Sequence, residues 1–399
     1  MQRRNVVVVG AGPVGTVAAL ACARLGHAVS LLEEQPQPDA SPRASTTQPP
    51  TLEILAELGL IDEYIAQGLV SRTIQFWDRP TKTLVAEFDF DRISDETAFP
   101  YAVQTEQHKL ANMGIARLRT MGNAEVRLGT RVTGLAQKED RVEVETDAGT
   151  RFVADYVIGC DGGRSIIRKA LDIEFEGYTW PERFLVITTL FDFERALGCG
   201  FRCYWADPEE WTNLFKVAGD DLKGRWRAVF RTREDESDAE ALSDAAVRAR
   251  LSRIFVPENR RDYVHLNLYN VHQRVAKQFR KGRVFLCGDS AHVNNPIGGL
   301  GLNCGIHEAW DLAGLLDSVL KGNSPGTVLD AYERRRRPLN IEYVQEQTVA
   351  NKKRLEERDP AQRARRFAEL RAAADDPARH KAFLMKASLL ESIRRAIRT

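Results

Sequence analysis

Short apolar runs and a helical stretch alternate near the start of the chain. Residues 5–9 form a β-branched run that predicts a buried parallel strand. Residues 16–25 are rich in alanine and leucine and predict a helix that ends at Gly26. Residues 28–32 predict a second buried strand. The order strand, helix, strand indicates a βαβ unit, in which a helix joins two parallel strands.

The pattern changes twice further along the chain. Aromatic and β-branched residues gather in stretches that predict antiparallel strands, at 74–77, 84–88, 185–193, 201–205, 212–217 and 225–231. After Pro338 the pattern instead predicts charged helices, at 340–357, 360–371 and 380–398. The chain is therefore expected to have an α/β fold with a second, sheet-based unit and a helical C-terminal segment.

Composition and charge exclude several kinds of protein. The 399 residues carry 57 Lys plus Arg against 56 Asp plus Glu, a net charge of +1, so neither nucleic acid nor an acidic membrane is indicated as a partner. No apolar run is long enough to span a membrane. The six cysteines form no CxxC pair, which favours free thiols in a reducing cytoplasm over a disulfide framework or a metal site.

A glycine-rich turn joins the first strand to the first helix, with the sequence Gly10, Ala11, Gly12, Pro13, Val14, Gly15. In a dinucleotide-binding unit the first glycine permits the tight turn, the second lets a pyrophosphate approach the backbone, and the third lets the helix pack on the strand. Glu33 ends the second strand, where a carboxylate binds a ribose hydroxyl. The pattern predicts a dinucleotide and leaves both FAD and NAD open.

Two further segments place carboxylates directly after predicted strands. The strand at 154–159 is followed by Asp161 in an Asp-Gly turn, which puts a carboxylate at a crevice. The strand at 283–287 is followed by Asp289 and then by a glycine-rich loop that opens on a helix near Leu302. The amides of such a helix N-terminus can face an electron-rich ring edge.

The Gly10 fingerprint, the Asp161 segment and the Asp289 segment, in this order and spacing, resemble those of the single-component (class A) FAD-dependent aromatic hydroxylases. Para-hydroxybenzoate, phenol and 3-(3-hydroxyphenyl)propionate hydroxylases are familiar members. The resemblance covers most of residues 1–345. It implies a Rossmann-like, glutathione-reductase-like FAD-binding domain at 1–71, 101–174 and 273–345, an inserted substrate domain at 72–100 and 175–272, and C-terminal helices at 346–399. These helices would cover the FAD domain or pair with another subunit.

The resemblance also implies which residues bind the nucleotide half of FAD. Glu33, beside Glu34, resembles the adenosine-ribose ligand, and Val132 resembles the position whose backbone meets the adenine. The pyrophosphate is expected along Gly10, Gly12, Pro13, Val14 and Gly15. Asp161 resembles the aspartate that serves both FAD and a transient NADH or NADPH.

The flavin half is assigned in the same way. Arg43 resembles the arginine beside the flavin, Gln104 the glutamine at the ribityl or pyrophosphate region, and Asp289 the ribityl ligand. The loop on the oxygen-reactive side of the flavin is expected to include Pro296, Gly299, Leu300, Gly301, Leu302 and Asn303. The sequence departs from the family pattern at Glu34, at Ser290 and at the His307-Glu308 pair, which weakens the subfamily assignment but removes no expected ligand.

The implied activity is an NAD(P)H-dependent monooxygenase that hydroxylates a phenolic or hydroxylated N-heteroaromatic compound through a flavin C4a-hydroperoxide, with O2 as co-substrate. The chain has no second GxGxxG unit, so the nicotinamide cofactor would have no Rossmann domain of its own. Two alternatives stay open: an FAD oxidoreductase of the same fold without oxygen insertion, and a flavin-binding protein without turnover. Monomer and homodimer are both compatible with the sequence.

Residues that bind the aromatic substrate are harder to identify. Tyr204 is expected in the ring-binding pocket because it lies on a predicted inner strand. Candidates to hold a substrate carboxylate are four arginines of the aromatic segment, Arg202, Arg225, Arg227 and Arg231, and the sequence does not choose among them. His292, close to Asp289, is expected to be structural.

Overall fold

The computed structural model describes residues 4–41, 45–257 and 263–398. Five parallel strands form the first sheet: β1 (Arg4–Val9), β2 (Val29–Leu32), β8 (Ala124–Arg127), β11 (Arg151–Gly159) and β18 (Val284–Leu286). Their order is β18-β11-β1-β2-β8, with β17 (Arg280–Lys281) antiparallel at the β18 edge. A hairpin of β9 (Val132–Gln137) and β10 (Val142–Thr146) extends from β11. The predicted N-terminal strands are confirmed.

Helices pack on this sheet because its central strands are apolar on both faces. Val6, Val7 and Val8 are completely buried, which explains the continuous apolar run. Helix α1 (Pro13–Arg24) packs against both α4 (Gln107–Arg119) and α9 (Gly301–Leu320). The short helix α5 (Ile166–Ala170) follows β11. The α/β class inferred from the sequence is therefore confirmed.

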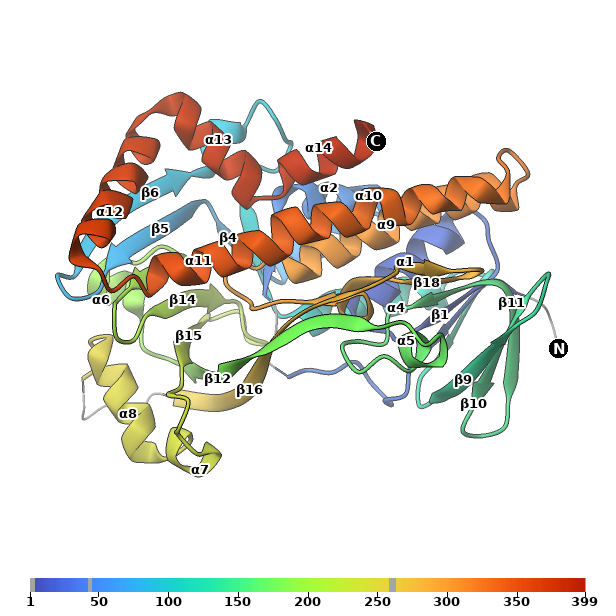
Figure 1. The fold of residues 1–399 in the computed structure, drawn as a ribbon, viewed down its shortest axis with the longest axis horizontal. Helices are drawn as coiled ribbons and strands as arrows, with labels where there is room; N and C mark the ends of the chain where they lie inside the picture. Colours follow the sequence, from blue (N-terminus) through green and yellow to red (C-terminus); the bar gives the residue numbers. More distant parts are fainter. Residues whose placement is uncertain (1–3, 42–44, 258–262, 399) are drawn as a thin grey trace.

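The second sheet has eight strands within the described residues, in the order β19-β16-β12-β15-β14-β13-β5-β6. They are β5 (Thr73–Asp78), β6 (Thr83–Asp89), β12 (Phe175–Thr189), β13 (Arg202–Ala206), β14 (Thr212–Val217), β15 (Arg225–Arg231), β16 (Tyr263–Ala276) and β19 (His292–Val293). Only the β13–β5 pair is parallel among these. The long strands β12 and β16 run from this sheet towards the first sheet (Figure 1).

One predicted strand has different ends from those expected. Strand β12 begins at Phe175 and stops at Thr189, whereas the sequence indicated 185–193. The carboxylate of Asp192 accepts the backbone N–H of Glu194 at 3.1 Å and so begins helix α6 (Phe193–Leu197). The division into an FAD-binding and a substrate domain stays a prediction.

Small elements connect the two sheets. A three-stranded sheet in the order β3-β7-β4 contains β3 (Thr46–Thr47), β4 (Leu69–Ser71) and β7 (Ala102–Gln104). Helices α2 (Pro49–Glu57) and α3 (Ile61–Ala66) lie between β3 and β4 in the chain. Helices α7 (Asp238–Ala241) and α8 (Asp244–Arg253) follow β15, and Val247 and Leu251 of α8 share an apolar cluster with Trp205.

The C-terminal segment packs partly on the face of the second sheet that carries Tyr204 and partly on α2 and α9. It contains α10 (Asp330–Asn340), a π-helical turn (Ile341–Glu346), α11 (Gln347–Leu355), α12 (Pro360–Asp375), α13 (Pro377–Ala387) and α14 (Leu390–Arg398). The single helix expected at 380–398 is in fact two, because Leu389 adopts a left-handed conformation with φ of 67°.

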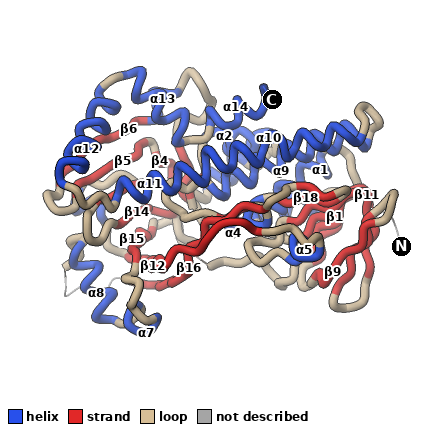
Figure 2. Tube along the Cα trace, in the orientation of Figure 1, coloured by secondary structure: helices blue, strands red, loops and turns tan. Residues whose placement is uncertain are grey.

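Packing shows what these helices cover. Helix α12 contacts β6, α13 contacts the 3-10 turn Phe90–Ile93, and α14 contacts α2 and α10. Figure 2 shows α12 and α13 next to β5 and β6 of the second sheet. Leu370, Leu384 and Leu390 share an apolar cluster with sheet residues that include Tyr204. In the described part of the chain, no helix is long and apolar enough to cross a membrane.

Candidate active site

Four sequence motifs meet at one edge of the first sheet. Gly10 follows β1, Glu33 follows β2, Asp161 lies just beyond β11, and Gly288 lies just beyond β18. The strand ends are in register, since Val9 pairs with both Gly159 and Leu32, and Gly159 pairs with Leu286. The carboxyl edge of a parallel sheet is where ligands bind in this class of fold.

The glycine turn is closely packed at two positions and open at the third. A Cβ atom on Gly10, whose φ is 99°, would lie 2.4 Å from the carbonyl oxygen of Cys160. A Cβ on Gly15 would lie 1.9 Å from the carbonyl oxygen of Gly10. Around Gly12, by contrast, no atom of the described chain other than those of Gly12 and its two neighbours lies within 4 Å of the position of a Cβ. This is the arrangement that a close-approaching pyrophosphate requires.

The residues expected at the adenosine end differ in their surroundings. Glu33 accepts the N–H of Ala11 at 2.7 Å and that of Gln35 at 3.0 Å, which ties it to the glycine turn. Glu34 is exposed and lies 3.6 Å from Arg131. Val132 is buried at the start of β9. Arg43 lies outside the described residues, so its predicted place beside the flavin is untested.

Asp161 is held by the beginning of α5. Its carboxylate accepts the hydroxyl of Ser165 at 2.6 Å and the backbone N–H of Ile167 at 3.1 Å. Burial raises the pKa of Asp161 above its usual value, although these hydrogen bonds favour the ionised form. The side chain therefore has a fixed orientation at the sheet edge. Its dual role towards FAD and NAD(P)H remains a proposal.

The Gly288 turn, α1 and α9 meet in a tight contact. A Cβ on Gly305 of α9 would lie 2.8 Å from both the Cα of Gly288 and the side chain of Val14. Asp289, on this turn, is exposed at the surface of the described chain. The predicted pyrophosphate helix α1 therefore packs, through Val14, against the turn that carries Asp289.

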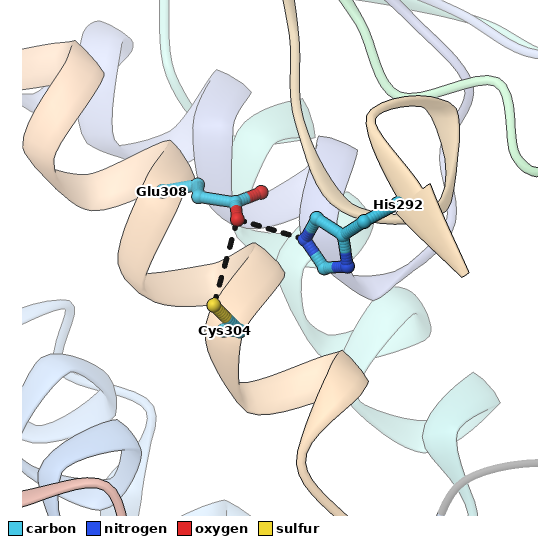
Figure 3. Close-up of side chains that lie close together, drawn as sticks. All are labelled: His292, Cys304 and Glu308. Carbon is cyan, nitrogen blue, oxygen red and sulfur yellow. Dashed lines mark hydrogen bonds and ion pairs between the residues drawn. The ribbon is translucent and has the colours of Figure 1, made fainter. Parts of the chain in front are cut away.

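A buried cluster of three polar side chains, His292, Cys304 and Glu308, lies next to the same turn (Figure 3). Glu308 of α9 accepts the N–H of Gly288 at 2.8 Å and pairs with His292 at 2.7 Å, and both side chains are fully buried. Cys304, one turn earlier on α9, donates to Glu308 at 3.5 Å. Although burial opposes it, the charge of Glu308 raises the pKa of His292. The structural role expected of His292 is thus joined to Glu308, which the sequence marked only as a departure.

These three side chains carry metal-ligand atoms that lie within 4.8 Å of one another. Their arrangement nevertheless favours a hydrogen-bonded cluster. His292 and Glu308 are bonded directly at 2.7 Å. Burial raises the pKa of Cys304 well above its usual value, and a metal needs the thiolate.

Asn303 joins the glycine-rich loop to the segment before α2. Its amide donates to the carbonyl oxygens of Thr46 at 2.9 Å and Gly299 at 2.7 Å. Its Oδ1 accepts the N–H of Gln48 and the hydroxyl of Thr51, both at 2.8 Å. Asn303 can make these four hydrogen bonds together because its amide has two donors and its oxygen two lone pairs. Asn303 and Gly299 therefore lie together, and their place beside the flavin stays a prediction.

Gln104 of β7 accepts the hydroxyl of Thr46 at 2.8 Å, which places it beside the residues bonded to Asn303. The other residues of the predicted loop differ in their surroundings. Gly301 and Leu302 are half-buried at the start of α9, and Pro296 is exposed. Leu300 instead points into an apolar cluster with Tyr343 and Leu389. Its side chain therefore packs on the C-terminal helices, and only its backbone lies in the loop.

Unused buried polar atoms show that this region fits a cofactor. Within the described chain, Oε1 of Gln48 and Nε2 of Gln104 are buried without a hydrogen-bond partner. Such groups cost free energy unless a ligand or water satisfies them. Together with the open space at Gly12, they fit a dinucleotide that runs from the glycine turn to the Asn303 loop. Gln48 and Thr51 carried no recognisable motif in the sequence.

The polar network includes a histidine with an unusual pKa. His307 lies 2.8 Å from the hydroxyl of Thr51, and burial near Arg336 lowers its pKa to about 3. Between the ordinary value of 6.5 and about 3, the unfolded chain binds a proton that the folded protein does not. The contribution of His307 to the free energy of unfolding is therefore fully present above pH 6.5 and is lost as the pH falls.

This linkage gives a pH prediction. Between pH 6.5 and pH 5, the free energy of unfolding of the unmodified protein should fall by about 1.5 kcal/mol more than that of His307→Gln. Urea unfolding at both pH values measures the difference. His292→Gln is the matched control, because the raised pKa of His292 gives stability that is lost as the pH rises instead. Equal losses in His307→Gln and the unmodified protein would contradict the prediction.

The second sheet brings Tyr204 and one of the four arginines to the glycine-rich loop. Arg202 donates through Nη2 to the carbonyl oxygen of Gly298 at 2.7 Å and through Nε to the hydroxyl of Tyr204 at 3.1 Å. Tyr204 is buried and stacks on Phe76, with ring centroids 5.3 Å apart. Arg225 and Arg231 turn elsewhere, towards Asp221 and the carbonyl oxygen of Glu209.

Comparison with known proteins agrees with this geometry. Residues 3–347 match the family model described as an FAD binding domain. The chain is 36% identical over 392 residues to para-nitrophenol 4-monooxygenase of Pseudomonas sp. (strain WBC-3), covering 96% of this chain and 94% of that protein. It is 33% identical over 369 residues to 6-hydroxy-3-succinoylpyridine 3-monooxygenase HspB of Pseudomonas putida (strain DSM 28022 / S16), covering 90% and 91%.

A solved structure shows the same likeness. The crystal structure of p-nitrophenol 4-monooxygenase PnpA from Pseudomonas putida DLL-E4 superposes with a TM-score of 0.91 at 32% identity, covering 98% of each chain. The match thus includes both sheets and the C-terminal helices. The chain belongs to the family of single-component, FAD-dependent aromatic hydroxylases.

Proposed function

We propose that the protein hydroxylates a phenolic or hydroxylated N-heteroaromatic compound, with bound FAD, NADH or NADPH, and O2. The observation that carries this proposal is the contact between Arg202 on β13 and Gly298 of the predicted flavin loop, at 2.7 Å. It joins the aromatic face of the second sheet to the cofactor loop. The names of two relatives, a para-nitrophenol and a hydroxypyridine monooxygenase, support this substrate class.

FAD in this site would accept a hydride from NAD(P)H and activate O2 for the insertion of a hydroxyl group. The chain itself must orient the ring and exclude water, because access of water would favour release of the activated oxygen as hydrogen peroxide. Phe76 and Trp211 are buried in the same apolar cluster as Tyr204, and aromatic side chains of this kind suit a planar ring. The amides at the beginning of α9 can stabilise negative charge on the flavin.

Tyr204 is proposed to bind the ring hydroxyl of the substrate. Its own oxygen accepts a hydrogen bond from Arg202, so its hydroxyl proton is available for an oxygen of the ligand. A tyrosine in this position can donate to a substrate oxygen or receive its proton as the ring becomes more nucleophilic.

Replacement of Tyr204 tests this role. We expect Tyr204→Phe to bind FAD normally but to hydroxylate at least about tenfold more slowly and to release more of its oxygen as peroxide. Stopped-flow kinetics and peroxide yield measure the two effects. Tyr269→Phe is a control on the same sheet, in β16. An unchanged rate, peroxide yield and pH profile in Tyr204→Phe would remove Tyr204 from the mechanism.

The proposed activity itself is tested on the purified, FAD-loaded protein. NADH or NADPH oxidation, oxygen uptake and peroxide would be followed with para-nitrophenol, 6-hydroxy-3-succinoylpyridine and other hydroxylated aromatic acids. A compound that speeds oxidation with little peroxide and yields a hydroxylated product supports the proposal. If no compound is hydroxylated and anaerobic turnover proceeds equally fast, an FAD oxidoreductase without oxygen insertion replaces it.

A further inference from the structure

One buried positive charge on the second sheet has no carboxylate beside it. Arg202 is 2% exposed, and its two hydrogen bonds go to a carbonyl oxygen and a tyrosine hydroxyl. In the described residues its third nitrogen, Nη1, is buried with no partner, and no ion pair joins Arg202 to an acidic side chain. A buried, uncompensated charge is costly unless a ligand of opposite charge completes it.

The other buried arginine of this face is different. Arg227 is close enough to Glu106 to be influenced by its negative charge. Strand register places Arg227 opposite Phe215 of β14, and Phe215 opposite Arg202 of β13. The two arginines are therefore separated by one aromatic side chain in a single row across the sheet. Arg202 also contacts the predicted flavin loop, at Gly298.

Further polar atoms on the same face lack partners. Asn213 lies opposite Tyr204, and its buried Oδ1 has no hydrogen-bond partner in the described chain. The hydroxyl of Thr188, which lies opposite Arg227, is buried and unsatisfied there too. Phe215 meets Tyr204 edge to face at 6.1 Å. A ligand on this face would therefore meet aromatic rings and several unused hydrogen-bonding groups together.

We propose that Arg202 is the anion-binding residue of the substrate pocket, so that the enzyme selects aromatic substrates carrying an anionic oxygen and holds this oxygen against β13. The inference rests on the proposed function and adds the charge of the substrate. The anionic oxygen is either a phenolate or a carboxylate. A planar guanidinium with a free nitrogen suits both.

Ligand binding without turnover tests the proposal. Difference spectra of the bound flavin would give dissociation constants, in the absence of NAD(P)H, at a pH where para-nitrophenol is ionised. Para-nitrophenol is compared with its methyl ether to test the phenolate, and 4-hydroxybenzoate with 4-hydroxybenzamide to test the carboxylate. The unmodified protein should prefer the charged member of at least one pair by about 30-fold.

The variants are Arg202→Met, Arg202→Lys and the control Arg225→Met, whose arginine pairs with Asp221 instead. Arg202→Met should bind FAD and the neutral ligands within about a factor of three of the unmodified protein but lose the charge preference. Arg202→Lys should keep part of the preference, and Arg225→Met all of it. The pair that loses its discrimination identifies the group that Arg202 holds.

Two results would overturn the inference. One is an unmodified protein that binds the charged and neutral members of both pairs equally, a measurement that does not depend on any variant. The other is an Arg202→Met variant that keeps the preference for the charged ligand. Failure of the proposed function is distinct, because the unmodified protein would then hydroxylate no compound even though its ligand preferences could be measured.

Discussion

Gly12→Ala is expected to give a folded protein that has lost FAD. The helix α1 begins after Gly12, and apart from its two neighbours in the chain no described residue has an atom within 4 Å of where a Cβ on Gly12 would be. The free energy of unfolding of the FAD-free protein should therefore change by no more than about 1 kcal/mol. The methyl group would occupy the space in which the pyrophosphate approaches the backbone, so FAD affinity should fall at least about 100-fold.

Gly15→Ala provides the contrast. An added Cβ would lie 1.9 Å from the carbonyl oxygen of Gly10, so the backbone at Gly10 and the backbone at Gly15 would have to move apart. We expect the FAD-free protein to lose roughly 3 kcal/mol or more of its free energy of unfolding. Urea unfolding and FAD titration of both variants separate the two effects. If Gly12→Ala binds FAD as tightly as the unmodified protein, the pyrophosphate does not lie at this turn.

Glu308→Ala is expected to destabilise the fold by roughly 3–5 kcal/mol. The substitution leaves His292 in a fully buried site without its partner and removes the acceptor for the N–H of Gly288. FAD affinity should fall as well, because the Gly288 turn carries Asp289. Lys321→Ala, at the end of the same helix, removes an exposed ion pair with Asp317 and should cost less than about 1 kcal/mol.

A double variant distinguishes a buried pair from simple loss of volume. The singles are Glu308→Leu and His292→Phe, and the double variant carries both substitutions. If the loss of the buried pair causes the destabilisation, the double variant should lose less free energy of unfolding than the sum of the two single losses. Denaturant unfolding of the four proteins gives this coupling. Additive effects, or a Glu308→Ala variant as stable as the unmodified protein, would contradict the assigned role of the cluster.

The sequence by itself determined the parallel sheet and the motifs at its carboxyl edge. The turn from Gly10 to Gly15 and the carboxylates of Glu33, Asp161 and Asp289 lie within a few residues of strand ends. Parallel strands bring their carboxyl ends to one edge, so local motifs there become neighbours in space without further information. The antiparallel strands of the aromatic segment were also predictable, because side-chain alternation is a local property.

Only the tertiary structure decided which side chains complete the site. Arg202 could not be told from Arg225 or Arg231 in the sequence, because burial and partners depend on strands that pair across the sheet. The role of Glu308 was hidden for the same reason, since Gly288 and His292 reach it from another element. The break at Leu389 has no glycine or proline to mark it, and the Leu389 side chain is buried there in a cluster with Leu300 and Tyr343. Periodicity and spacing describe residues that are close along the chain, whereas the role of a buried charge depends on residues that only the fold brings close to it.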